Sequence, residues 1–316
     1  MECPLAADAE WAGVIEAPPH MKRPMMEARR SSDIGLRRGR ILPNLPQSQQ
    51  LDLIADGLPV LMKSAQDLLS ASKRLGERGR VAIMLESHAT EELAKALILV
   101  DIVRCPPKLR PSRIATMMGW FYDHLARLIY VDAQSWKPTS VTQLQSYVDD
   151  HRKSHYLEGS VGEYIFPNWT IYMRESLLYA DLITHEDGVP MWNDPVIPPS
   201  AFGFGEPSAW RICQALQDMG AFTRHGLDVM SSAWRCTEFA GPQSWSDTKH
   251  LTRKMLEALE SAGLISERAT SEQVGTLLHN WQMPMYNIDF EKIDVPLNEL
   301  QADRDANLWS EYGDWP

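Results

Sequence analysis

The strongest pattern of apolar positions in the chain runs from Arg80 to Arg104, where apolar side chains recur about every 3.6 residues. This period predicts one amphipathic helix, which must end before Pro106 because the residue before a proline disfavours the helical conformation. The apolar positions that form its stripe are Val81, Leu85, Ala89, Leu93, Ala96, Leu99, Val100 and Val103. We expect the other helices to be organised around this one.

Further apolar stripes predict helices on both sides of the 80–104 helix. They cover residues 48–76, 111–136, 139–151, 172–183, 207–236, 246–262 and 271–281. Pro59 should break or kink the first of them near Gly57, because a proline removes one helical hydrogen bond. A capping box formed by Thr270 and Gln273 opens the last of them.

Three segments lack a helical period. Residues 158–167 and 184–208 are predicted loops, the second because its prolines forbid a continuous helix. Residues 287–316 are predicted to be irregular and acidic. No alternation of apolar and polar positions extends beyond four or five residues, so no strand is predicted. The predicted fold class is therefore all-α.

Composition and charge narrow the functional classes. The chain has 316 residues, of which 44% are hydrophobic and 23% charged, as in an ordinary soluble globular protein. Its net charge of −11 gives no global attraction to nucleic acid or to an anionic membrane, although a local basic groove is compatible with it. Four scattered cysteines without zinc spacing, no secretory signal and no apolar run of about 20 residues favour a cytoplasmic protein without a membrane span.

Residues 1–45 form a proline-containing arm without an apolar period. Between positions 21 and 45 this arm carries seven Lys or Arg residues against two acidic ones. A basic arm can contact RNA, a partner or an acidic face of its own protein, or it can be a solvated extension. We favour the solvated extension, and the contacts stay open as alternatives.

An acidic residue lies beside the middle of the apolar stripe of the 80–104 helix. This residue is Glu92, with Lys95 three residues after it and His88 four residues before it, so the three side chains can share one face. A carboxylate is costly to bury unless it is paired. The pattern indicates either an internal ion pair that fixes the helix register, which spacing alone favours, or a polar site inside a helical bundle.

A second group of ionisable residues borders the apolar seams of two later predicted helices. His124 lies on the 111–136 helix, Arg127 follows it by one turn, and Arg174 lies four residues before Leu178. Histidine suits acid–base chemistry near neutral pH, and arginine or lysine suits the negative charge that develops on a reacting phosphate.

If the chain cleaves RNA, these residues have distinct expected roles. His124 would be the acid–base catalyst, and Glu92 would orient it or an arginine. Arg127 and Arg174 would bind the RNA phosphate, and Lys95 would balance the local charge. The structural alternatives are a core His124 bonded to Glu92, a buried salt bridge of Arg174 with Glu91, Glu92 or Asp123, and a solvent-facing Arg127.

Two other kinds of site are weaker. His88, Glu91 or Glu92, Asp123 and His124 offer nitrogen and oxygen ligands on paper, but the inward Glu-x-x-His repeats of a di-iron bundle are absent, so we expect no metal and no cofactor. The chain has 11 tryptophans, and the aromatic residues after position 165 can stack bases. Such residues more often hold a loop-rich domain together or form a subunit contact, and we expect the first of these.

The run Ser87–Lys95, with the sequence Ser-His-Ala-Thr-Glu-Glu-Leu-Ala-Lys, resembles the Glu-Glu-x-x-Lys helix of the AbiV family of abortive-infection proteins. It follows the stretch Leu61–Leu69 and a Gly-Arg turn. Two later segments resemble further parts of that family in the expected order. They are Phe121–Arg127, and Arg174–Asp181 followed by Asp187-Gly188 and by Trp192 before Pro195. The resemblance covers roughly residues 50–195.

This resemblance implies antiphage defence inside bacteria. It also implies a fold similar to the HEPN group of helical bundles, many of which dimerise and cut RNA. The resemblance therefore predicts a HEPN-like bundle over residues 46–195, followed by a helical and loop-rich C-terminal extension over residues 196–316. The corresponding activity would be that of a homodimeric, metal-independent endoribonuclease toxin.

The chain departs from the HEPN pattern in one respect. HEPN nucleases usually carry an arginine, four to six residues and then a histidine, whereas seven residues separate Arg80 from His88 and ten separate Arg113 from His124. The alternative hypothesis is a non-catalytic dimeric helical module that arrests growth by binding a host or phage protein. The acidic net charge favours this alternative, because it weakens general affinity for RNA.

Overall fold

The computed structural model describes residues 41–76, 79–184, 188–197 and 206–312. In this part of the chain the protein is 64% helical, with eleven α-helices and two small two-stranded sheets. The predicted all-α class is confirmed. Residues 1–40, which hold most of the predicted basic arm, lie outside the described residues, as does Asp187.

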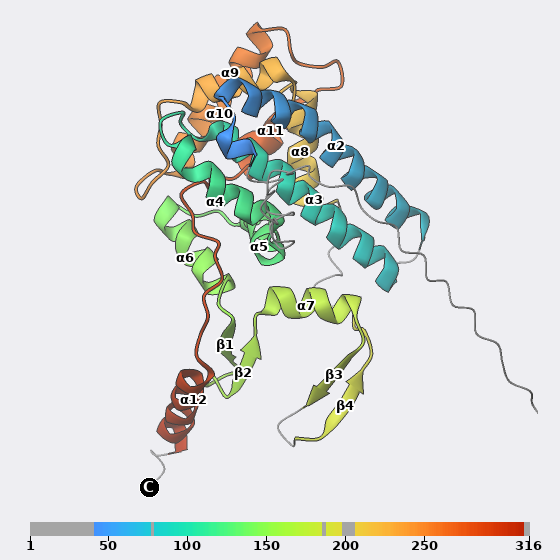
Figure 1. Ribbon diagram of the computed structural model, residues 1–316, viewed down its shortest axis with the longest axis vertical. Helices are drawn as coiled ribbons and strands as arrows, with labels where there is room; N and C mark the ends of the chain where they lie inside the picture. Colours follow the sequence, from blue (N-terminus) through green and yellow to red (C-terminus); the bar gives the residue numbers. More distant parts are fainter. Residues whose placement is uncertain (1–40, 77–78, 185–187, 198–205, 313–316) are drawn as a thin grey trace, which may run out of the picture.

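Two long helices, α2 (Gln47–Arg74) and α3 (Arg80–Arg104), run side by side across the helical body, with α2 on its outer side (Figure 1). α3 has the predicted bounds, and its second half is buried on almost all sides, which is typical of a central helix. α2 passes through Pro59 without a break, so the break predicted near Gly57 is wrong. Pro59 is exposed, where water can replace the lost hydrogen bond, and the adjacent Leu58 is fully buried and anchors the helix.

The predicted helix over residues 111–136 is two helices, α4 (Arg110–Tyr122) and α5 (His124–Ser135). The chain turns at Asp123, whose backbone is extended and whose Oδ1 accepts a hydrogen bond from Ala126 N at 2.7 Å. Aspartate is a strong N-cap because it satisfies one of the free N–H groups of the first helical turn. His124 is therefore the first residue of α5.

After α5 the chain forms a helix, a β-hairpin, a second helix and a second β-hairpin. These elements are α6 (Val141–His151), β1 (His155–Glu158), β2 (Tyr164–Pro167), α7 (Trp169–Leu178), β3 (Asp181–Thr184) and β4 (Pro190–Asn193). Both strand pairs are antiparallel. The predicted loops at 158–167 and 184–208 thus contain strands, and the predicted helix 172–183 starts three residues early and ends at Leu178. Strands of four residues are too short for alternation to reveal.

Four C-terminal helices share one continuous apolar core with α2 and α3: the first two of them pack against these long helices, and the last two pack against the first two. They are α8 (Ser208–Asp218), α9 (Arg224–Trp234), α10 (Trp245–Ser261) and α11 (Ser271–Asn280). The predicted helix 207–236 is split at Gly220, where φ is +76° and an added Cβ would lie 2.2 Å from Leu264 O. Only glycine tolerates that combination.

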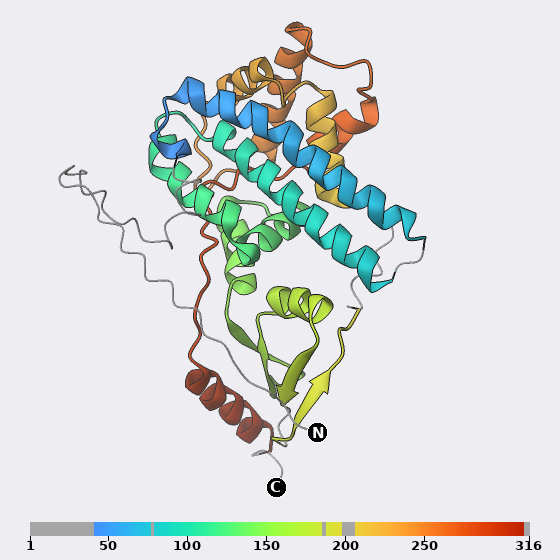
Figure 2. The ribbon, with the colours of Figure 1, turned by 45° about the vertical axis from the view of Figure 1, so that its right-hand side comes forward.

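Figures 1 and 2 show how the elements are layered. The large helical body lies at the top, and α7 lies below it with the two hairpins extending further away. A last helix, α12 (Leu297–Tyr312), packs beside β1 and β2, in a segment predicted to be irregular. A short 3-10 helix, η1 (Leu42–Asn44), precedes α2. No helix in the described residues is long and apolar enough to cross a membrane.

A fully buried carboxylate on α3 anchors the segment that follows α11. Asp101 accepts hydrogen bonds from Arg104 Nε at 2.7 Å, from Met285 N at 2.8 Å and from the Tyr130 hydroxyl. The side chains of Asp101 and Arg104 are at most 1% exposed. Each acceptor position of this buried carboxylate therefore faces a donor, as a buried charge requires.

The guanidinium of Arg104 is enclosed as completely as its partner. Its Nη1 donates to Gln282 O at 2.9 Å. Its central carbon lies 4.8 Å from the ring centre of Trp234 and 4.1 Å from that of Trp281, within the range of a cation–π contact. This network joins α3, α5, α9 and the residues after α11, and it is closed to solvent.

Candidate active site

A second buried carboxylate of α3, Glu91, collects three partners from two other helices. Arg174 of α7 donates from Nε to Oε1 at 3.0 Å. Arg127 Nη2 lies 2.8 Å from Oε2, and His124 Nδ1 lies 2.7 Å from the same oxygen, both from α5. The side chain of Glu91 is 5% exposed. We call these four residues the Glu91 centre.

The cations decide the protonation state of Glu91. Burial alone would raise its pKa by disfavouring the charged form. The hydrogen bond from Arg174, the charge of Arg127 and the contact with His124 outweigh burial, so the pKa of Glu91 is lowered from its ordinary value of 4.5. Glu91 is therefore a carboxylate at neutral pH and can only accept hydrogen bonds.

His124 is the member of the centre that reaches solvent, with a side chain that is 52% exposed. Its Nδ1 lies 2.6 Å from Arg127 Nη2 as well as 2.7 Å from Glu91 Oε2. Arginine can only donate, so Nδ1 cannot serve both neighbours at once. The charged carboxylate favours a proton on Nδ1, donated to Glu91, and this tautomer leaves Nε2 as the free proton acceptor.

The two arginines of the centre are covered rather than open. The side chain of Arg127 is 7% exposed and that of Arg174 is 14% exposed, so the structural alternative of a solvent-facing Arg127 is wrong. The alternative salt bridge of Arg174 with Glu91 is confirmed. Two guanidinium groups share one carboxylate, which leaves an excess positive charge beneath His124. In the described residues Arg127 Nε has no hydrogen-bond partner.

Glu92 and Lys95 do not join the centre. Lys95 Nζ lies 2.6 Å from Glu92 Oε1, both side chains are about a fifth exposed, and Lys95 also lies over the ring of Phe121. The expectation that Glu92 orients His124 or an arginine is wrong, because Glu91 does so. One residue turns a helix by about 100°. Glu91 faces α5 and α7 through its bonds, whereas the neighbouring Glu92 pairs with Lys95 on another side of α3.

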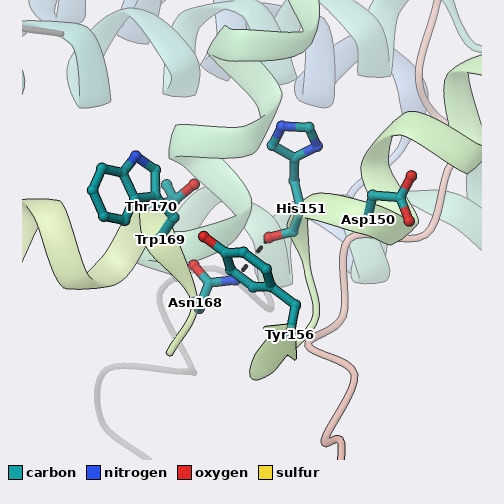
Figure 3. Close-up of a pocket in the computed structure, with 6 residues that line it drawn as sticks. All are labelled: Asp150, His151, Tyr156, Asn168, Trp169 and Thr170. Carbon is teal, nitrogen blue, oxygen red and sulfur yellow. Dashed lines mark hydrogen bonds between the residues drawn. The ribbon is translucent and has the colours of Figure 1, made fainter. Parts of the chain in front are cut away.

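A cavity of about 280 Å³ lies near the start of α7 (Figure 3). Its lining residues are Asp150, His151, Tyr156, Asn168, Trp169 and Thr170. We call it the α7 cavity. The sequence did not predict this cavity. Its walls come from α6, β1 and the start of α7, which are brought together by the hydrogen bonds of Asn168 to His151 O and Lys153 O. Within the described residues, no group of three or more His, Cys, Asp or Glu side chains is arranged to hold a metal ion.

Comparisons with models of known protein families, with curated proteins and with solved structures give no match for this chain. The resemblance to the AbiV family stays a prediction that rests on its motifs. One structural fact bears on those motifs. Glu91, His124 with Arg127, and Arg174 come from the three segments that carry the resemblance, and they meet at a single carboxylate.

Proposed function

We propose that this chain is a bacterial antiphage protein of the abortive-infection type that cleaves RNA without a metal ion. One observation supports this proposal above all. A half-exposed histidine, His124, is held through Nδ1 by the buried and charged carboxylate of Glu91. A carboxylate that fixes the tautomer and orientation of a histidine is a recurring arrangement for acid–base catalysis.

The proposed reaction balances with this one histidine. Nε2 of His124 takes the proton from a ribose 2′-hydroxyl, and the 2′-oxygen forms a bond to the adjacent phosphorus. The bond from phosphorus to the 5′-oxygen breaks, and the protonated Nε2 returns the proton to that oxygen. The products are a 2′,3′-cyclic phosphate and a 5′-hydroxyl. Glu91 stabilises the transient imidazolium by its charge.

The arginines have a positioning and electrostatic role in this proposal. Both are covered and bonded to Glu91, so they hold the carboxylate in place instead of forming an open phosphate fork. Their excess charge also favours an anionic phosphorane above His124, since charges act over longer distances in a partly desolvated site.

A cleavage assay with a matched histidine control tests the proposal. The full chain is incubated with a single-stranded RNA that contains all four bases, and the new ends are analysed. We expect cyclic phosphate ends, a rate lowered about 10²- to 10⁴-fold by His124→Ala, and no change with His250→Ala, which removes an exposed histidine of α10. Background cleavage by the unmodified chain, or equal rates for both variants, would overturn the proposal.

A second candidate function has its own observation. Eight large apolar side chains between residues 164 and 196 are exposed. They are Tyr164, Trp169, Tyr179, Leu182, Val189, Met191, Trp192 and Val196. They lie on or beside the two hairpins and α7, and exposed large apolar side chains often mark surfaces that bind other proteins. This surface and the covered arginines favour a dimeric module that arrests growth by binding a host or phage protein.

Expression in a bacterial host separates the two functions. If the chain is a nuclease, His124→Ala abolishes growth arrest. If it is a binding module, His124→Ala still arrests growth, and the double substitution Leu182→Ser with Trp192→Ser on the second hairpin abolishes arrest. Recovery of RNA alone, with no protein, when the chain is purified from infected cells would count against the module.

A further inference from the structure

The α7 cavity is a preformed space, and three of its six lining residues carry aromatic rings. Figure 3 shows the indole of Trp169 on one side of the group and the imidazole of His151 above its middle, with the Tyr156 ring below beside the Asn168 amide. Asn168 donates from Nδ2 to His151 O and Lys153 O, both at 2.7 Å, and its Oδ1 accepts from Ile171 N at 3.1 Å. Asn168 therefore builds the cavity, and both of its amide protons are already used, which leaves only the second lone pair of Oδ1 for a ligand.

The aromatic walls are fixed in place by neighbouring rings. The imidazole of His151 lies 4.1 Å from the ring centre of Tyr147, and its Nδ1 donates to Tyr147 O at 2.7 Å. On the other side, Trp169 contacts Phe166 and Tyr172, with ring centres 6.4 and 5.9 Å away. Trp169 is nevertheless 44% exposed. We expected the aromatic residues after position 165 to hold the fold together. That role does not explain why so much of the Trp169 ring is left exposed to solvent.

The charges at the cavity decide which chemistry it can accept. None of its lining residues is a lysine or an arginine, and its one acidic residue, Asp150, is paired with Lys153 at 2.9 Å. An anion would have no cation to bind inside. An uncharged planar ring can stack on Trp169 or Tyr156 and can bond at its edge to the Thr170 hydroxyl. The volume lies just below the range of about 300–1,000 Å³ that is typical of small-molecule pockets, so it suits one ring system.

We infer that the α7 cavity binds one nucleobase of a single-stranded RNA by stacking. This inference rests on the proposed function, because it supplies a base subsite for the same substrate. α7 connects the two sites, because Trp169 lines the cavity and Arg174 contacts Glu91. Arg174 lies five residues after Trp169, which is about 7.5 Å further along the helix axis and about 140° around it, so the bound strand would curve around α7 between the two sites. The phosphates of the strand lie outside the cavity, toward the excess charge of the Glu91 centre.

Binding measurements with an uncleavable ligand test this inference. The probe is a fluorescein-labelled 2′-O-methyl RNA of mixed sequence, and its anisotropy is followed with the full chain. Stacking of one base predicts that Trp169→Ala weakens binding about 5- to 100-fold. Trp169→Phe keeps a stacking face and should retain most of the affinity. Trp309→Ala, which removes a tryptophan of α12 that is 77% exposed, should change nothing.

Two further ligands identify what occupies the cavity. An oligonucleotide of the same length that lacks all bases should bind as weakly to the unmodified chain as the mixed RNA binds to Trp169→Ala. Adenosine monophosphate should compete only at concentrations far above those of the RNA. Equal binding by Trp169→Ala and the unmodified chain would overturn the inference, as would full affinity for the abasic strand. Tighter binding of free adenosine monophosphate than of RNA would overturn it in favour of a nucleotide site.

The cleavage assay is read separately, so the two proposals can fail independently. If the chain cleaves RNA but Trp169→Ala binds normally, the base subsite is wrong and the proposed function stands. If the chain binds RNA through Trp169 but produces no His124-dependent cleavage, the proposed function is wrong and the binding site stands.

Discussion

α3 carries two buried carboxylates, and their surroundings differ in one decisive respect. Asp101 is bonded to Arg104, Tyr130 and Met285 N, and every partner is sealed inside the core. Glu91 is bonded to two covered arginines and to His124, which is half exposed. A closed network can only hold the fold together, whereas an open one can also exchange protons with a ligand. Burial of a charge alone therefore does not identify a functional site.

The largest expected effect is on the closed network. Asp101→Ala leaves the Arg104 guanidinium buried without its carboxylate, so we expect a loss of about 3–5 kcal/mol in the free energy of unfolding. Urea denaturation of the full chain measures this loss. Asp67→Ala, which removes an exposed surface pair with Lys63, is the control and should cost less than about 1 kcal/mol. A similar small loss for both variants would show that Asp101 is not an anchor.

The two neighbouring acids of α3 should differ strongly. Glu91→Ala leaves the covered guanidinium groups of Arg127 and Arg174 without their carboxylate, and we expect a loss of about 3 kcal/mol. Glu92→Ala removes one partly exposed pair with Lys95, and we expect at most about 1 kcal/mol. The same denaturation experiment compares them. Equal losses, or a larger loss for Glu92→Ala, would contradict the placement of Glu91 at the centre.

The contribution of Glu91 to stability should depend on pH. Its pKa is lower in the folded protein than the ordinary value of 4.5, so its stabilising contribution is fully present above that value and is lost as the pH falls through the folded pKa. The difference in unfolding free energy between the unmodified chain and Glu91→Gln should shrink as the pH falls below about 4.5. A difference that persists unchanged at the lowest pH where the fold survives would contradict the lowered pKa.

The smallest expected effect on stability belongs to His124. Its ring is half exposed and Glu91 keeps both arginines after its removal, so His124→Ala should change the free energy of unfolding by less than about 1 kcal/mol. Thermal unfolding followed by circular dichroism is sufficient. A loss as large as that of Asp101→Ala would show that His124 is a structural residue. The Glu91 centre would then serve to stabilise the fold, as the Asp101 network does.

The long helices with a regular apolar period were predicted from the sequence, whereas the points where two predicted helices are interrupted were not. The bounds of α3 and the start of α11 follow directly from apolar spacing and from the capping box at Thr270. The turn at Asp123 was missed because an aspartate inside an apolar period reads equally well as a surface residue and as an N-cap. The split at Gly220 depends on the approach of Leu264, which is distant in the sequence.

The sequence predicted the histidine and the two arginines of the candidate site, but not the carboxylate that they bind. His124, Arg127 and Arg174 border apolar seams, and the structure brings them together at one carboxylate. The choice of Glu92 over Glu91 failed because α3 is enclosed on several sides, so one apolar stripe cannot tell which of two adjacent acids faces α5 and α7. The α7 cavity depends on the contacts of Asn168 with the end of α6, which no local pattern reveals.

The most direct test of the Glu91 centre is the single-turnover rate of RNA cleavage for Glu91→Gln and Glu92→Gln, measured beside His124→Ala. The account predicts that Glu91→Gln and His124→Ala each lower the rate at least tenfold, and that Glu92→Gln cleaves like the unmodified chain. Equal rates for Glu91→Gln and Glu92→Gln, or full activity of His124→Ala, would contradict it.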